Sequence, residues 1–560
     1  DETTEWPAWV AVEDLQGKAG ALWKLPKASG RPGTQDSVAV GVDFGTTNTV
    51  IYFAREADTK LISTEENALN LKDIPQLVHW ISADSGASRE AWFLPDVANV
   101  ADPAQIPSAV WTTAERDLYA IRWSVPWNST ASTIPQHDPR RIWVPVRGFK
   151  WDDQGRDCSA ERLGFLRELF FFALPAIWAR LEGPPAALPS FSLGFSYPLA
   201  FQHQQREAYG KLLAQLASEI GSRSRNIDST VAINESIAAV TAFGAPSSGD
   251  MFLVADLGGR TLDVSLLEYI NEPQKLKDPN HYEQLGSVDF GGEAFLDAIC
   301  GSTTTSKGEQ YWQLRDRLAQ QRNGSMTFPN GDAVLNRLVP MALEFLRVMI
   351  AAYREKEAAQ QQANGETVTS RKIQVLLVGN GWRLMELRAG NRDPGKFSED
   401  YYAQALTWFG DKNVALYPTR NQSVRNTKDR VAVGALKNLR NLKTNELVKG
   451  SEVLCKLPSG RKIVAGGETV EWHTLLGTGG WMYEKGDTEL SANIKKIQVD
   501  GPAVPATWDG HLQRALDPVD QTNLENQIRE TLQLVATRSN GRLEKGPLTI
   551  LMENHWKPSL

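Results

Sequence analysis

The sequence contains few cysteines, and none of them is spaced to bind a metal or to build a disulfide framework. The 560-residue chain has three, Cys158, Cys300 and Cys455, which lie far apart. Its seven histidines show no metal-ligand spacing either. These absences argue against a small disulfide-stapled scaffold and lead us to expect a reducing, cytoplasmic compartment.

Long uninterrupted hydrophobic runs are also missing. The most apolar segment, 163–181, is broken by Arg167, Glu168 and Arg180, whereas a membrane span needs about 20 predominantly apolar residues. We therefore expect a buried helix there and no membrane span. The first residues are acidic where a secretory signal has a basic flank, so we expect no signal peptide.

Two familiar catalytic patterns are absent as well. The sequence has no G-x-x-x-x-G-K-[ST] motif, which excludes a P-loop site. A partial nucleophile elbow at 194–198 ends in Pro198 where glycine is needed, so we interpret it as the end of a strand. With 60 basic and 67 acidic residues the formal charge is −7, which argues against direct binding of nucleic acid.

What the sequence does contain is one device that occurs twice. An apolar run reaches Asp43 and continues as D-F-G-T-T-N-T-V-I-Y-F, and a second run reaches Asp256 and continues as D-L-G-G-R-T-L-D-V-S-L-L. Each pattern predicts a β-hairpin with a glycine-containing turn. Because internal repeats indicate repeated structural units, the pair predicts two lobes built on the same plan.

The two hairpins together suit a chain of phosphates. A tight turn with glycine directs several N–H groups at one point and lets an anion approach closely. An aspartate at the strand end would repel phosphate, but it can hold Mg²⁺ through the water molecules that this ion retains. Two such turns facing each other would hold one polyphosphate from both sides.

The same motifs, with others in the same order, resemble the 70-kDa heat-shock chaperones of the actin-like ATPase superfamily. The similarity covers about residues 37–440. The segment 233–244 resembles the helix that connects the two lobes in these chaperones. The Asn-Glu pair at 234–235, where this helix would start, favours the chaperone branch over actin or bacterial filament proteins. The motifs are G-V-D-F-G-T-T-N-T at 41–49, A-D-L-G-G-R-T-L-D-V-S at 255–265, I-N-E-S-I-A-A-V-T-A-F-G at 233–244, G-S-V-D-F-G-G-E-A-F-L at 286–296, V-G-N-G-W-R-L at 378–384 and V-A-V-G-A-L at 431–436.

The resemblance implies a role for each matching residue. Asp43 and Asp256 would orient the hydration shell of Mg²⁺, Asp263 would support water or metal, and Glu235 would position the attacking water. The remaining site residues would contact the nucleotide itself. Those on the phosphates are Gly45, Thr46, Thr47, Gly258, Gly259, Arg260 and Thr261, those near the ribose are Gly292 and Glu293, and those around the adenosine are Gly379, Asn380, Gly381 and Arg383.

Three positions depart from the family pattern. Arg260 stands where the chaperones usually have a third glycine, so it could reach the terminal phosphate or obstruct the turn. Asn380 replaces another glycine, which is tolerable because Asn enters left-handed conformations more readily than most residues. The family's catalytic lysine has no clear match, and Lys150 is the candidate that we name.

The resemblance also implies an α/β fold with two duplicated, ribonuclease-H-like lobes around a nucleotide cleft. Helices are expected near 202–220, at 338–358 with Pro340 in the first turn, and at 431–442. The predicted domains are an irregular N-terminal arm at 1–36, lobe I at 37–245 with a loop-rich insertion at about 100–160, lobe II at 246–427, a helix returning to lobe I at 428–443, and a C-terminal extension at 444–560.

The function implied is an ATP-binding and ATP-hydrolysing switch, dependent on Mg²⁺, that regulates or remodels a protein partner. The partner is not identified by the sequence, and self-association stays open. We expect 444–560 to bind that partner. A small-molecule kinase and a non-hydrolysing scaffold or filament subunit remain alternatives, because fold alone does not determine function.

Overall fold

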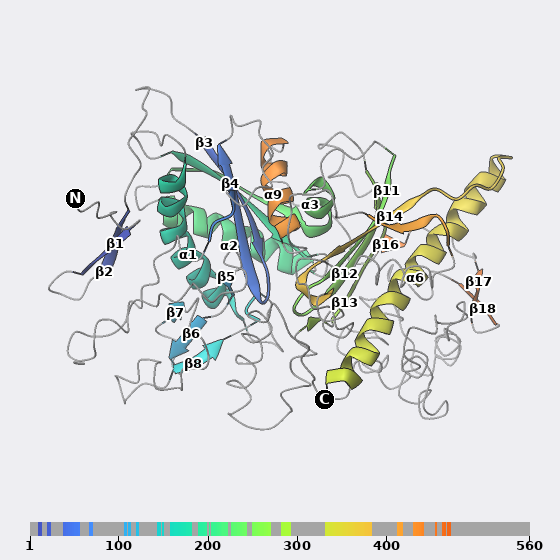
Figure 1. Ribbon diagram of the computed structural model, residues 1–560, viewed down its shortest axis with the longest axis horizontal. Coiled ribbons are helices and arrows are strands. Elements are labelled where there is room, and N and C mark those ends of the chain that lie inside the picture. Colours follow the sequence, from blue (N-terminus) through green and yellow to red (C-terminus); the bar gives the residue numbers. More distant parts are fainter. Residues whose placement is uncertain are drawn as a thin grey trace, which may run out of the picture.

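The computed structural model describes the strands and helices of the central part of the chain and several shorter segments (Figure 1). The described residues are 9–13, 19–23, 37–55, 67–70, 106–108, 110–113, 119–121, 143–146, 148–150, 157–181, 189–198, 201, 203–221, 226–242, 249–269, 282–289, 291–292, 331–382, 411–417, 429–441, 454–455, 462–465 and 468–471.

The first large sheet has five strands in the order β10-β9-β3-β4-β5. β3 pairs in parallel with β9, and β9 in parallel with β10, whereas β3–β4 and β4–β5 are antiparallel. The β3–β4 pair is the first predicted hairpin, and Gly45 N–H donates to Asn48 O within its turn. The strands are β3 (Ser37–Phe44), β4 (Asn48–Arg55), β5 (Ile106–Pro107), β9 (Ser190–Tyr197) and β10 (Asn226–Asn234).

The second large sheet follows the same order, with one strand added at its edge: β15-β14-β11-β12-β13-β16. Again the first strand pairs in parallel with the fourth and antiparallel with the second. The β11–β12 pair is the second predicted hairpin, with Asp256 opposite Asp263. The strands are β11 (Met251–Leu257), β12 (Leu262–Glu268), β13 (Tyr282–Val288), β14 (Ile373–Val378), β15 (Val414–Leu416) and β16 (Leu454–Cys455).

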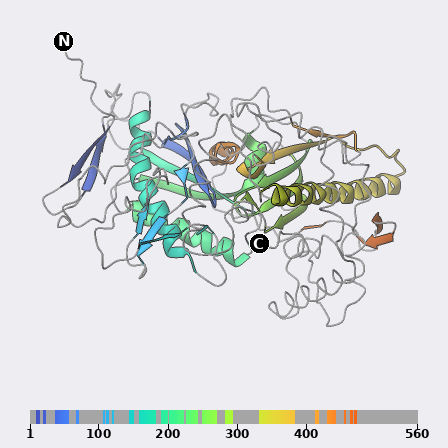
Figure 2. The same ribbon diagram turned by 60° about the horizontal axis from the view of Figure 1, so that its bottom comes forward.

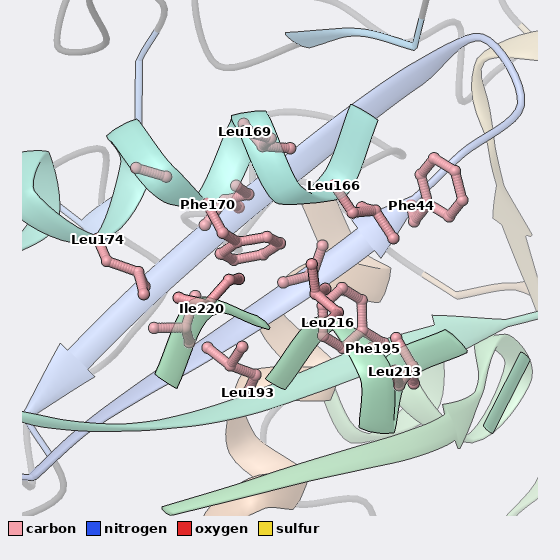
Figure 3. Close-up of a cluster of buried hydrophobic side chains, with 14 of the residues drawn as sticks. Phe44, Leu166, Leu169, Phe170, Leu174, Leu193, Phe195, Leu213, Leu216 and Ile220 are labelled. Carbon is pink, nitrogen blue, oxygen red and sulfur yellow. The ribbon is translucent and has the colours of Figure 1, made fainter. Parts of the chain in front are cut away.

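Side chains on the two faces of β3 pack into two different hydrophobic cores. Val38, Val40 and Val42 join a large apolar cluster with α1 (Ser159–Arg180) and α2 (His203–Gly221). Figure 3 shows Phe170 of α1 and Leu216 of α2 lying together in this cluster, so both helices cover the same face of the sheet. The central strands are buried along almost their whole length, as is typical of a sheet covered on both faces.

The opposite face of the first sheet is lined by small residues and receives α9 (Asp429–Asn441). A side-chain carbon at Gly41 would meet Ala432 O at 2.2 Å, so glycine is what lets the helix approach. α3 (Glu235–Ala242) packs in turn on the apolar face of the second sheet. Figures 1 and 2 both show α3 and α9 side by side between the two sheets.

α3 and α9 contact each other and tie the two sheets together. Gly434 of α9 lies directly on the backbone of Ala238, and Lys437 Nζ donates to Ala242 O at 2.8 Å. Arg430 of α9 also donates to Leu377 O of β14 in the second sheet at 3.2 Å. The helix pair therefore contacts both sheets and joins them.

Several sequence predictions differ from the structure. The 1–36 arm, expected to be irregular, contains an antiparallel hairpin of β1 (Trp9–Glu13) and β2 (Ala19–Trp23). The segment expected to be loop-rich holds β5 and a three-stranded sheet, which no clear periodicity in the sequence indicated. Its strands are β6 (Val110–Thr113), β7 (Tyr119–Ile121) and β8 (Trp143–Val146).

The long helix of the second half is also longer than expected. α6 spans Gly331–Ala363, so Pro340 lies inside the helix and not in its first turn. The turn preceding Pro340 is therefore helical although proline disfavours that conformation, which is why the sequence pattern placed the start of this helix too late.

Among the described residues, no helix combines the length and the apolar character that a membrane span requires. β17 (Lys462–Ala465) and β18 (Glu468–Glu471) form a separate hairpin.

The α3–α9 contact yields a prediction about stability. In Gly434→Ala the new carbon would lie 1.6 Å from Ala238 O, so the helices must separate, and overpacking of this kind typically costs about 1–3 kcal/mol. We expect a clear fall in the thermal unfolding midpoint, measured by circular dichroism. Gly221→Ala, at the end of α2 with no atom within 4 Å, is the matched control and should be neutral or slightly stabilising. Equal midpoints for the two variants would contradict the close crossing.

Candidate functional site

Polar residues gather where the parallel strands of the first sheet end. Asp43 is the second-last residue of β3, Ser196 is the second-last residue of β9, and Asn234 is the last residue of β10. Glu235 follows as the first residue of α3, whose start is capped because Asn234 Oδ1 accepts from Ser236 N–H at 2.9 Å. In open α/β sheets, ligands bind beyond the carboxyl ends of the strands, so this edge is the expected place for a site.

A buried ion pair stands at this edge. Lys150 Nζ donates to Glu235 Oε1 at 2.8 Å, and the two side chains are only 5% and 8% exposed. Lys150 belongs to a short segment after β8, far from Glu235 in the sequence. Removing one member of a buried pair leaves an uncompensated charge, so the loss of either residue should be strongly destabilising.

Ser196 links this pair to Asp43. Its hydroxyl lies 3.1 Å from Asp43 Oδ1 and 3.4 Å from Glu235 Oε1. The Tyr209 hydroxyl of α2 donates to the backbone oxygen of Ser196 at 3.2 Å and helps to hold Ser196 in place. Burial, with the negative charges of Glu235 and Asp43, raises the pKa of Tyr209, so its hydroxyl stays protonated and remains a donor.

The second sheet brings a matching set of residues to its own strand ends. Asp256 on β11 lies in register with Val378 on β14, and the chain then turns at Gly379 with φ of 89°. A side-chain carbon at Gly379 would meet Asp256 Oδ1 at 2.4 Å. Only glycine therefore fits here, for its positive φ and for the close approach, and the predicted adenosine motif is brought against the predicted magnesium aspartate.

The turn of the second hairpin also contacts the Gly-Gly segment that follows β13. Gly258 N–H donates to Thr261 O at 2.9 Å, and Gly292 N–H donates to Gly258 O at 3.0 Å. Arg260 Nε lies 3.2 Å from Asp289 Oδ1 with both side chains partly exposed. Arg260 is thus paired with a carboxylate of the segment that follows β13.

Asp263 connects the two halves of the site electrostatically. It is 2% exposed, and Thr261 Oγ1 donates to its Oδ2 at 3.2 Å. Burial, followed by the charge of Glu235 at the start of α3, raises the pKa of Asp263 to about 7, and a hydrogen bond from the Ser287 side chain acts against this rise. The Ser287 contact lies outside normal hydrogen-bond geometry for the buried Oδ1 of Asp263, so we regard it as weak.

Four buried carboxyl groups lie at these strand ends. They belong to Asp43, Glu235, Asp256 and Asp263, and Lys150 pairs with Glu235. Magnesium prefers oxygen ligands and binds carboxylates directly or through its retained water, so this arrangement suits a bound cation. Within the described ranges no three His, Cys, Asp or Glu side chains are placed to ligate a metal directly. An ion held through water fits both observations.

The structure thus places most of the predicted site residues at adjoining strand ends. Glu293 and Arg383 lie outside the described residues, as does the side chain of Asn380. Sequence analysis missed Ser196, Tyr209 and Asp289. Ser196 fell within the segment dismissed as a strand end, and its neighbours in space come from β3 and α3, which no local pattern reveals.

Comparison with known proteins supports the class suggested by this geometry, the superfamily of 70-kDa heat-shock-like and actin-like ATPases. No family model matches the chain. It is 26% identical over 266 residues to a chaperone protein HscA homolog of Herminiimonas arsenicoxydans, and 25% identical over 300 residues to a mitochondrial 70-kDa heat shock protein of Pisum sativum. These alignments cover 47% and 52% of the chain but only 37% and 38% of the relatives' length.

The raised pKa of Asp263 gives a pH prediction for the protein without nucleotide or divalent ions. A carboxyl whose folded-state pKa lies above its ordinary value of 3.8 favours folding when protonated, so this contribution is lost as pH rises from about 4 through 7. Asp263→Asn mimics the protonated form. We expect the variant to be more stable than the wild type at pH 8 and to show a clearly smaller advantage at pH 5, where only part of the contribution has been lost. A difference in unfolding midpoint that is the same at both pH values would contradict the burial of a charged Asp263.

Proposed function

We propose that this protein binds ATP with Mg²⁺ between its two sheets, hydrolyses it, and uses the cycle to change the relative position of two lobes of the same plan. The observation that carries the proposal is the convergence of Asp43, Lys150, Glu235 and Asp263 from both sheets on one group of buried charges. The shared strand order of the sheets and the distant chaperone relatives support it.

The proposed roles follow from these positions. The turns at 45–47 and 258–261 supply N–H groups and hydroxyls to the phosphates, and the turn at Gly379 receives the nucleoside. Glu235 orients the attacking water, held in place by Lys150. Hydrolysis through a loose, metaphosphate-like transition state requires mainly positioning and charge stabilisation, which these groups can provide.

Asp43 and Asp256 would hold the magnesium ion through water, with Asp263 supporting the same hydration shell. Such an ion neutralises charge on the phosphates and on the surrounding carboxylates. The buried carboxyl of Asp263 would offer this shell an acceptor.

Arg260 fits a role at the terminal phosphate. Its pair with Asp289 is partly exposed, and exposed ion pairs typically contribute only about 0–1 kcal/mol. Charge-assisted hydrogen bonds of the kind made to phosphate are stronger, roughly 1.5–3 kcal/mol. We therefore propose that ATP draws Arg260 away from Asp289.

The output of the cycle would pass through the α3–α9 pair. Glu235 opens α3, so a change at the nucleotide acts directly on the helix that packs on the second sheet and against α9. The 444–560 extension, from which β16 joins the edge of the second sheet beside β13, is proposed to carry the movement to a protein partner. Hinged lobes closing around a ligand are an established form of such a switch.

The proposal predicts that binding and chemistry can be separated by mutation. Glu235→Gln keeps the shape of the side chain but removes its charge, so single-turnover ATP hydrolysis should fall roughly ten- to a thousandfold while ATP affinity stays nearly unchanged. Glu235→Ala should behave alike if the protein remains folded. Asp43→Asn should instead weaken magnesium-dependent ATP binding as well. Equilibrium binding and single-turnover rates measured on the same preparations give both quantities.

Glu207→Gln on the exposed surface of α2 is the matched control and should hydrolyse ATP like the wild type. Normal turnover in folded Glu235→Gln would remove Glu235 from the mechanism. ATP binding without any hydrolysis by the wild type would favour the scaffold alternative, and phosphate transfer to an added small molecule would favour the kinase.

A further inference from the structure

Lys150 lies on a turn and not on a helix or strand, so regular secondary structure does not fix its position. This turn follows Gly148, whose φ is 65°, and precedes α1. Lysine has a flexible stem with about 2 kcal/mol of rotamer entropy, and loops vary more than the elements that they connect. A buried Nζ at 2.8 Å from Glu235 therefore requires something that fixes the backbone of this turn.

Arg162, on the first turns of α1, makes the contacts that do so. Its Nη1 donates to Phe149 O at 3.2 Å and to Lys150 O at 3.3 Å, so one guanidinium holds two successive carbonyls. Its Nη2 donates to Ser159 Oγ at 3.2 Å, which fixes the guanidinium itself. Arg162 is 7% exposed, so water does not compete freely for these bonds.

The turn is anchored a second time by packing. The ring of Phe149 lies 5.3 Å from that of Phe165 on α1 and 6.1 Å from that of Phe44 at the end of β3, measured between centroids. Aromatic pairs at such distances stabilise beyond the burial of their surface. The ring holds the turn against the core, and the bonds from Arg162 hold the backbone carbonyls of the turn itself.

A different role for Arg162 would be to neutralise an acid. One carboxylate contact is to Asp157 at 3.8 Å, and Asp157 is 79% exposed, so this particular pair contributes little. The planar fork of the guanidinium suits two neighbouring acceptors, which the single ammonium of lysine does not. Geometry therefore favours a role in which the shape of Arg162 matters more than its charge.

We propose that Arg162 is a positioning residue that sets Lys150 against Glu235 and thereby controls ATP hydrolysis without contacting the nucleotide. This inference rests on the proposed function. Arg162 should then affect the rate of the chemical step and leave ATP affinity alone, because displacement of a catalytic group by about 1 Å can cost about a hundredfold in rate.

The test compares Arg162→Lys, which keeps the charge but loses the fork, with the wild type in single-turnover hydrolysis and equilibrium ATP binding. We expect turnover to fall about ten- to a hundredfold with affinity within about threefold. Arg167→Lys is the matched control on the same helix, since Arg167 pairs with Glu219 and should tolerate the change. Thermal midpoints show that each variant is folded.

A double-mutant cycle tests whether Arg162 affects hydrolysis through Lys150. If Arg162 acts through Lys150, adding Arg162→Lys to Lys150→Met should slow hydrolysis little further, since the group that it positions is gone. The same loss in both backgrounds, or wild-type turnover in Arg162→Lys, overturns the proposal while the proposed function stands. Absence of hydrolysis by the wild type overturns both.

Discussion

The ion pair between Lys150 and Glu235 is the interaction on which the arrangement of the site depends. It joins a turn before α1 to the first residue of α3, and Ser196 extends it to Asp43 on β3. Each of these elements needs its own support, from Arg162 behind the turn and Asn234 at the helix start. The pair is buried, so its geometry must be good for the charges to be tolerated.

The buried carboxyl groups around this pair support the proposal that these residues bind a ligand. Asp43 and Asp263 are buried near Glu235, and burial together with the charge of Glu235 raises the pKa of Asp263. A protein selected only for stability would gain by replacing such groups with apolar ones. Perturbed carboxylates at the ends of strands are instead typical of functional sites. The contact between α3 and α9 then connects this edge to both sheets.

The sequence predicted the features that depend on local pattern. The two hairpins were visible because an apolar run, an aspartate and a glycine turn lie together, and α1, α2 and α9 were found near their observed bounds. Features that depend on distant contacts were not visible. Lys150 could only be guessed, since its partner lies 85 positions away, and Ser196 gained meaning only beside β3. The start of α6 was misplaced because Pro340 suggested a first turn.

Calorimetric titration of the wild-type protein with ATP, with Mg²⁺ and then with a chelator, tests the central claim most directly. The buried carboxylates repel a bare triphosphate, so the account predicts saturable binding with Mg²⁺ that weakens at least about tenfold when the ion is removed, a difference of about 1.4 kcal/mol. ATP binding of equal strength with and without Mg²⁺, or no binding at all, would contradict it.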